Sequence, residues 1–280
     1  MSSRTQKEMA AQFRQMHHVS LPLVLPNAWD AASARIFELA GFQAIATTSS
    51  GIAASLGYRD GQQISRDAMI DAIARITRVV ECPVTADIEA GFGHSIEEVV
   101  QTVKEVINAG AVGFNIEDSL KQGGKALVDV AYQTGLIRAL RELATMLDVP
   151  FVINARVDVF LLAIGEPEQR FEHAVQRARA YLQAGADCIY PIGLLPSDVI
   201  TSLVQAIDGP INIMGGPSAQ TLPELKDLGV ARVSLAGGLM RSALAHIYTV
   251  ARELIEYGTY TSMNTEGLSS ATFRSLFDRN

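Results

Sequence analysis

The chain has 280 residues, of which 48% are hydrophobic, and its formal net charge is −7. This composition excludes an intrinsically disordered chain, and an acidic chain without a basic run is a poor candidate for nucleic-acid binding. No stretch approaches the roughly 18 apolar residues of a membrane span, and residues 1–18 lack the apolar region of a secretory signal, so we expect a cytoplasmic protein without nucleic-acid or membrane partners.

Short apolar runs recur along the chain, and each is followed by a longer stretch with helical periodicity. Eight runs are predicted to be strands: residues 23–28, 44–50, 84–89, 113–118, 151–158, 188–192, 211–216 and 232–237. Near-continuous apolar strands are typical of a parallel sheet that is buried on both faces. The helices between them are predicted to begin at N-caps such as Asp30, Ser65 and Ser95. Glycines 41, 110, 185 and 229 are predicted to close helices as left-handed caps.

Eight repeated helix–turn–strand units predict an α/β fold, a closed (β/α)8 TIM-type barrel, with an open doubly wound sheet as the alternative. We expect residues 1–256 to form one catalytic barrel. Residues 257–280 have no strand partner and are expected to form a C-terminal extension that packs on the barrel or on a neighbouring subunit. Because the chemistry of such barrels lies at the C-terminal ends of the strands, polar residues that end the predicted strands are candidate site residues.

The second predicted strand ends in the sequence TTSSG at residues 47–51. A glycine leaves backbone N–H groups accessible, and the serines add hydroxyl donors. Ser49, Ser50 and Gly51 are therefore candidates to bind an anionic oxygen, and an ordinary strand-to-loop turn is the alternative.

The third and fourth predicted strands both end in acidic residues. The third ends in Asp87 and Glu89, which period-2 geometry puts on one side of the strand. The fourth ends in Glu117 and Asp118 at the equivalent height. Burying such carboxylates costs several kcal/mol each unless a cation is present, and a hard divalent ion with oxygen ligands supplies one. We expect Mg²⁺, with Mn²⁺ as a substitute, bound directly by Asp87 and through water by Glu117 and Glu89, with solvated loop acids as the alternative.

The fifth predicted strand ends in Arg156 and Asp158. The guanidinium fork of Arg156 could bind a substrate carboxylate bidentately, and a structural ion pair with Asp158 or Glu117 is the alternative. Beside a metal ion, this would form an electrophilic centre. A 2-oxo acid could chelate the ion, which would stabilise an enolate when a neighbouring C–C or P–C bond breaks.

These residues resemble the signatures of the phosphoenolpyruvate mutase/isocitrate lyase superfamily over about residues 20–256. The sequence PNAWDAASA at 26–34 is similar to its first-strand signature, and Ser50 with Gly51 matches its backbone clamp for a carboxylate. Asp60, in GYRDG at 57–61, resembles the aspartate after its second strand. DIEAGFG at 87–93 looks like its metal motif, usually DxDxGYG, and residues 115–118 and 155–158 match the next two signatures. The resemblance implies bound Mg²⁺, an oxo-acid substrate and a tetramer that exchanges C-terminal helices.

Two departures from the family bear on the reaction. The lyase members carry a KKCGH loop after the fourth strand, where this chain has SLKQGGK at 119–125. They also carry a glutamate where this chain has Ile192, and although Asn212 is retained, the Thr-Glu that follows it is not. A long tricarboxylate would therefore lack its usual partners.

The leading hypothesis is a Mg²⁺-dependent lyase that cleaves a C–C bond of a small 2-oxo or 2-hydroxy carboxylate. The expected catalytic residues are Asp60, Arg156 and Glu117, the expected metal ligands are Asp87, Glu89 and Glu117, and the expected substrate-binding residues are Ser49, Ser50, Gly51, Arg156 and Asn212. Lys121 or Lys125 could serve on a gating loop. The alternatives are a hydrolase, an oxaloacetate decarboxylase or a phosphonomutase on the same fold, and a barrel that only binds a metabolite. We expect a homotetramer or a homodimer.

Overall fold

The computed structural model describes residues 4–120, 125–263 and 268–278. All strand pairs in this part of the chain are parallel, and they form two groups in the orders β1-β9-β8 and β2-β3-β4-β5-β6-β7. The strands are β1 (Leu23–Leu25), β2 (Asn27–Ala28), β3 (Ile45–Thr47), β4 (Val84–Asp87), β5 (Gly113–Glu117), β6 (Val152–Val157), β7 (Cys188–Pro191), β8 (Asn212–Met214) and β9 (Arg232–Ser234).

The two groups join into one closed barrel. β1 and β2 are two parts of one strand, separated at Pro26, which has no backbone N–H to donate. On the other side, Ile189 of β7 pairs in parallel with Ile211, directly before β8. The prediction of an eight-stranded (β/α)8 barrel is therefore confirmed, and the open sheet is wrong.

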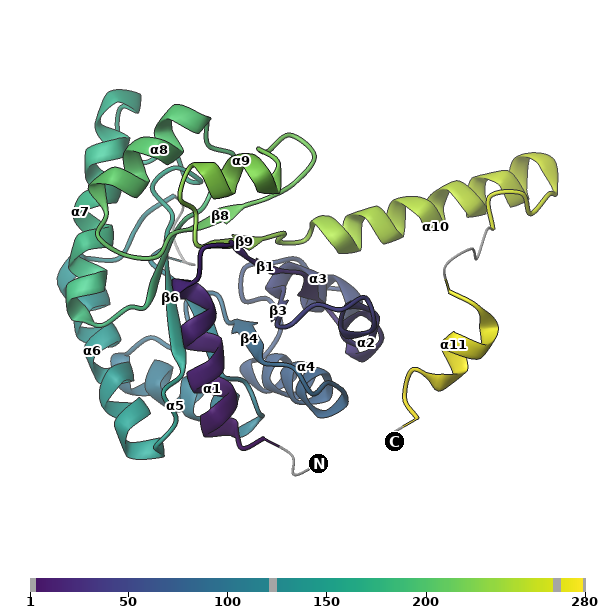
Figure 1. The fold of residues 1–280 in the computed structure, drawn as a ribbon, viewed down its shortest axis with the longest axis horizontal. Coiled ribbons are helices and arrows are strands. Elements are labelled where there is room, and N and C mark those ends of the chain that lie inside the picture. Colours follow the sequence, from purple (N-terminus) through teal and green to yellow (C-terminus); the bar gives the residue numbers. More distant parts are fainter. Residues whose placement is uncertain (1–3, 121–124, 264–267, 279–280) are drawn as a thin grey trace.

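Helices surround the strands (Figure 1). They are α1 (Gln6–Gln15), α2 (Ala31–Leu39), α3 (Ser49–Ser55), α4 (Arg66–Val79), α5 (Ile96–Asn108), α6 (Val130–Leu147), α7 (Pro167–Ala184), α8 (Ser197–Ala206), α9 (Leu222–Asp227), α10 (Gly238–Tyr257) and α11 (Ser270–Ser275), with a 3-10 turn at Met16–His18. The predicted N-caps Asp30, Ser65 and Ser95 each accept a backbone hydrogen bond. All four predicted glycine caps have positive φ. Within the described ranges, no helix is long and apolar enough to cross a bilayer.

Helix α1 was not predicted, and it closes the N-terminal end of the barrel. Thr5 and Glu8 form a reciprocal capping box at its start. Gln6 donates to the carbonyls of Ile107, in the last turn of α5, and Ala111, just before β5. Phe13 is fully buried with Ala10, Leu25 and Val152 in a second, smaller core cluster inside the barrel.

The register of the strands defines which side chains share the barrel interior, because paired residues on parallel strands point to the same face. Asp87, Asn115, Asn154 and Cys188 form one row across β4 to β7, and Glu117, Arg156 and Tyr190 form the row above it. The alternate residues, such as Phe114, Ile116 and Ile153, belong to the main hydrophobic core under the helices.

The C-terminal part of the chain leaves the barrel with α10, which extends away from it (Figure 1). α11 lies near α2, where Arg35 Nε donates to the carbonyl of Leu276 at 2.6 Å and Leu276 is buried. The division of the chain at residue 257 stays a prediction.

Candidate active site at the barrel mouth

Asp87 ends β4, and its two carboxylate oxygens have different surroundings. Oδ2 accepts hydrogen bonds from the backbone N–H of Ser49 at 3.1 Å and from the Ser49 hydroxyl at 2.9 Å. Oδ1 is buried, and it accepts no hydrogen bond from the part of the chain that the structure describes. A buried oxygen of this kind costs free energy unless another group approaches it, so Oδ1 marks a position for a ligand.

The segment after β3 differs from the prediction. The strand ends at Thr47 rather than at residue 50, and Ser49, Ser50 and Gly51 form the first turn of α3, with Thr48 as N-cap. A Cβ on Gly51 would lie 2.5 Å from Thr48 Cγ2 and 2.9 Å from the Cβ of Trp29. Only glycine therefore fits where α3 begins against the end of β2.

Asp60 is exposed and lies next to this turn. Its Oδ1 is 3.2 Å from the hydroxyl of Ser49, which is also within hydrogen-bonding distance of Asp87. A hydroxyl has one proton to donate, so Ser49 can serve only one of the two carboxylates at a time. The fold thus brings three predicted site residues, Asp60, Ser49 and Asp87, into one hydrogen-bonded group.

Glu89 lies in the turn after β4 and not in the strand itself. β4 ends at Asp87, and Glu89 has φ of 53°, in the left-handed region. This conformation costs a non-glycine residue about 1 kcal/mol or more and is concentrated at functional sites. The side chain is buried, and its Oε1 accepts from the backbone N–H of Gln62 at 2.9 Å. The expectation that Asp87 and Glu89 lie on one side of a continuous strand is therefore wrong.

Arg156 forms ion pairs with both Glu117 and Asp158, the structural pairing that the sequence offered as the alternative to substrate binding. Its Nη1 lies 2.6 Å from Glu117 Oε2, and its Nε and Nη2 bind the two oxygens of Asp158 at 2.6 and 2.7 Å. Burial disfavours the charged guanidinium, but Glu117 and Asp158 outweigh burial and raise the pKa of Arg156. A guanidinium has five N–H groups, so these three contacts leave two available.

Asp118, although it belongs to the same sequence pattern, serves a structural role. It is fully buried and accepts from the backbone N–H of Asp158, the hydroxyl of Tyr181 and Nη1 of Arg177. Arg177 also donates to the carbonyl of Val128. This group holds the segment after β5 to α7.

Asn212 lies at the start of β8. It is fully buried, its Cα pairs with Arg232, and its amide donates to the hydroxyl of Ser234. Tyr190 had not been selected from the sequence, although it is in register with Arg156 and its buried hydroxyl has no partner in the described residues. Lys121 lies outside the described residues, and Lys125 is exposed.

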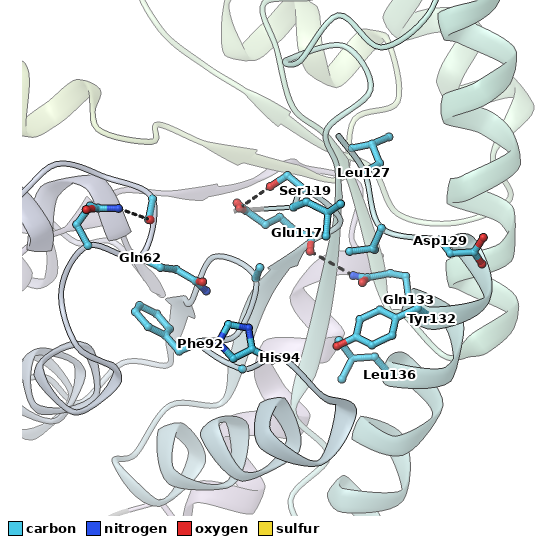
Figure 2. Close-up of a pocket in the computed structure, with 16 residues that line it drawn as sticks. Gln62, Phe92, His94, Glu117, Ser119, Leu127, Asp129, Tyr132, Gln133 and Leu136 are labelled. Atoms are coloured by element: carbon cyan, nitrogen blue, oxygen red, sulfur yellow. Dashed lines mark hydrogen bonds between the residues drawn. The ribbon is translucent and has the colours of Figure 1, made fainter. Parts of the chain in front are cut away.

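A cavity of about 660 Å³ adjoins the mouth, between the segments that follow β4 and β5. Figure 2 shows Glu117 and Ser119 on one side of it and Phe92 and His94 on another. The Ser119 hydroxyl donates to Glu117 Oε1 at 2.7 Å. Glu117 is the one predicted site residue that lines this cavity, so the carboxylate of Glu117 connects the cavity to Arg156.

A ready-made cage for a metal is not part of the described chain. Among those residues, no group of three or more His, Cys, Asp and Glu side chains is arranged around one point. Such a cage is not required for Mg²⁺, which is usually bound through one or two carboxylates and retains several waters. The buried Oδ1 of Asp87, which accepts no hydrogen bond from the described residues, is a carboxylate oxygen of the kind that fits this ion.

The chain is similar to several known proteins. The family model described as phosphoenolpyruvate phosphomutase matches residues 13–255. The 2-methylisocitrate lyase of Escherichia coli (strain K12) is 35% identical over 246 residues, which cover 83% of this chain and 80% of that protein. A structure from Burkholderia cenocepacia J2315, provisionally described as a lyase/mutase, is 34% identical with a TM-score of 0.89 and covers 98% of this chain and 97% of that one. Phosphonopyruvate hydrolase in complex with oxalate and Mg²⁺ is 24% identical with a TM-score of 0.84, covers 96% of this chain and 94% of that one, and shares the fold.

Proposed function

Because the chain belongs to the phosphoenolpyruvate mutase/isocitrate lyase superfamily of enzymes, we propose that it is a Mg²⁺-dependent lyase that cleaves a C–C bond of a small 2-oxo or 2-hydroxy carboxylate. The observation that carries the proposal is the buried, unpartnered Oδ1 of Asp87 at the mouth of the barrel. Similarity to 2-methylisocitrate lyases supports a lyase over the other reactions of the superfamily.

The residues around Asp87 would hold the metal. Asp87 Oδ1 would be the direct ligand, while the two hydrogen bonds from Ser49 fix the orientation of its carboxylate. Glu89 and Glu117 would bind the water molecules that Mg²⁺ retains. When bound, Mg²⁺ would act as a Lewis acid on the oxygens of the oxo or hydroxy acid.

The remaining polar residues would bind the substrate and move a proton. Arg156 would use its two available N–H groups to orient the substrate carboxylate, while Glu117 and Asp158 hold its fork in place. Ser50 and Gly51 would contact the same carboxylate from the first turn of α3. Asp60, beside the Ser49 hydroxyl and open to solvent, would accept or supply the proton.

The other half of the mouth favours a small substrate. β3, β4 and β5 end in Thr47, Asp87 and Glu117, whereas β8 ends in Met214, and Ile192 and Leu235 directly follow β7 and β9. Ile192 is buried, and the other two are partly exposed. These apolar side chains offer no hydrogen bond to a further carboxylate, so a long tricarboxylate would have polar groups desolvated without partners.

We also propose that the enzyme is a homotetramer or homodimer in which α10 packs on a neighbouring subunit. α10 carries large apolar side chains that are mostly exposed, with exposed fractions of 61% for Ile247, 67% for Tyr248 and 81% for Ile255. An apolar surface of this kind marks an interaction site. Light scattering after size-exclusion chromatography should show a multimer, and Ile247→Asp should dissociate it. A monomeric wild-type protein would contradict this part of the proposal.

The reaction is tested by incubating the protein and Mg²⁺ with oxaloacetate, 2-oxoglutarate, isocitrate, methylisocitrate or phosphonopyruvate and following products by NMR. A lyase forms a 2-oxo acid such as pyruvate or glyoxylate and a second acid or aldehyde, whereas a decarboxylase forms pyruvate and CO₂ from oxaloacetate, and a hydrolase forms oxalate and acetate. Asp87→Ala should abolish turnover without unfolding the chain. The matched control is Asp67→Ala, because the Asp67 side chain is 83% exposed and lies on α4. Unchanged turnover in Asp87→Ala would refute the metal role.

A further inference from the structure

A fully buried arginine, Arg232, lies inside the barrel beneath the candidate metal site. It is on β9 and has no exposed surface. Its Nη2 donates to Asn115 Oδ1 on β5 at 3.2 Å, and its Cζ lies 6.0 Å from the centre of the Phe13 ring in α1. β9 and β5 are not neighbours in the sheet, so the contact with Asn115 crosses the barrel interior.

The charge of Arg232 has no ion-pair partner in the described chain. Its Nε and Nη1 are buried without an acceptor there, and so are the acceptor atoms Asn154 Oδ1 and Asn212 Oδ1. Leaving a buried guanidinium uncompensated is strongly unfavourable, and the stacking on Phe13 returns only about 2 kcal/mol. Ordered water between these donors and acceptors would satisfy their hydrogen bonds, but it would not neutralise the charge.

Asp87 is one of three ionisable groups that act on the charge of Arg232. Asn115, which binds Arg232, is in register with Asp87 on the neighbouring strand. Burial lowers the pKa of Arg232, whereas negative charge on Cys188, Tyr190 or Asp87 would raise it. Burial also raises the pKa of the Cys188 thiol to about 12 and raises that of Tyr190, so neither group supplies a negative charge near neutral pH, and Asp87 is the carboxylate of the three.

We propose that Arg232 is a positioning residue, a fixed positive charge beneath Asp87 that weakens binding of a free divalent cation and strengthens binding of the anionic substrate. The proposal rests on the proposed metal site at Asp87. Water is excluded from the barrel interior more than from the mouth, so charges there act over longer distances than in solvent. A guanidinium below the site repels the metal ion and attracts the carboxylate of the substrate. Removing its charge should therefore raise the affinity for the metal ion and lower the affinity for the substrate.

The opposite signs provide the test, with Arg232→Met as the neutral variant of similar length and Arg232→Lys as the variant that keeps the charge. Mn²⁺ binding is measured by electron paramagnetic resonance without substrate. Oxalate binding is then measured by calorimetry at saturating Mn²⁺. Arg232→Met should bind Mn²⁺ about tenfold more tightly and oxalate about tenfold more weakly. Arg232→Lys should be closer to the wild type in both measurements.

The other outcomes are distinct. A general structural defect would weaken both affinities, and unchanged or weaker Mn²⁺ binding by folded Arg232→Met would overturn the proposal. If Arg232→Met does not fold, Arg232→Gln supplies a neutral side chain that can keep the bond to Asn115. Failure of both neutral variants to fold, while Arg232→Lys folds, would show that the charge is structural and would also overturn it. A wild-type protein that binds no Mn²⁺ would refute the proposed function itself.

Discussion

Two aspartates from the same sequence pattern should respond differently to replacement by asparagine, Asp118 with a loss of stability and Asp87 with a loss of metal binding. Asp118 accepts three hydrogen bonds, one of them from Arg177, whose side chain is only 8% exposed. In Asp118→Asn the amide N–H₂ faces donors, and the charge of Arg177 loses its counter-ion. Removing one partner of a buried ion pair destabilises a protein by about 3–5 kcal/mol, a large part of a total of about 5–15 kcal/mol.

Asp87→Asn should destabilise the fold less than Asp118→Asn does. Its amide oxygen can keep both hydrogen bonds from Ser49, and the N–H₂ group then takes the place of Oδ1, which has no donor near it in the described residues. The loss should stay below the roughly 3–5 kcal/mol expected for Asp118→Asn, because Asp87 forms no ion pair with another described residue. Binding of Mn²⁺, by contrast, should be lost in Asp87→Asn and kept in folded Asp118→Asn.

Urea unfolding followed by circular dichroism measures the first difference, and electron paramagnetic resonance of Mn²⁺ measures the second. Equal destabilisation by the two substitutions would refute the assignment of Asp118 to structure and Asp87 to ligand binding. Loss of Mn²⁺ binding in folded Asp118→Asn, with binding kept in Asp87→Asn, would reverse the assignment.

Three further outcomes are expected. His17 is buried, and burial lowers its pKa from 6.5 to about 3, so at pH 5 the unfolded chain binds a proton that the folded chain does not. The free energy of unfolding should therefore fall by about 2 kcal/mol between pH 7.5 and pH 5. Denaturant unfolding of His17→Gln at both pH values should show no such fall, and an equal fall in this variant would contradict the prediction. Gly51→Ala should destabilise the fold by about 1–3 kcal/mol, because the added Cβ would meet Thr48. The control Gly238→Ala, with open space at its Cβ, should not lower the melting temperature. Equal melting temperatures of the two variants would show that α3 shifts to make room. EDTA should abolish turnover and leave the far-ultraviolet circular dichroism unchanged, and activity that survives chelation would rule out the metal.

The barrel itself was predictable because its signals are local. The apolar runs, the N-caps Asp30 and Ser95 and the glycine caps each act within a few residues. Helix α1 was missed although its capping box, Thr5 with Glu8, is visible in the sequence. The positions of Asp87 and Glu117 at strand ends also follow from the pattern, because the ends of parallel strands meet at one edge.

The sequence by itself determined the fold, the strand ends that form the mouth and the residue types available there. Only the tertiary structure decided which polar side chains are partners. Asp118 binds Arg177, which is 59 residues away, and Arg232 binds Asn115, which is 117 residues away. The turn after β4 places Glu89 in the left-handed region, which no strand pattern contains. Burial and partnership arise from packing between distant segments, so side chains that look equivalent along the chain acquire different roles once the barrel closes.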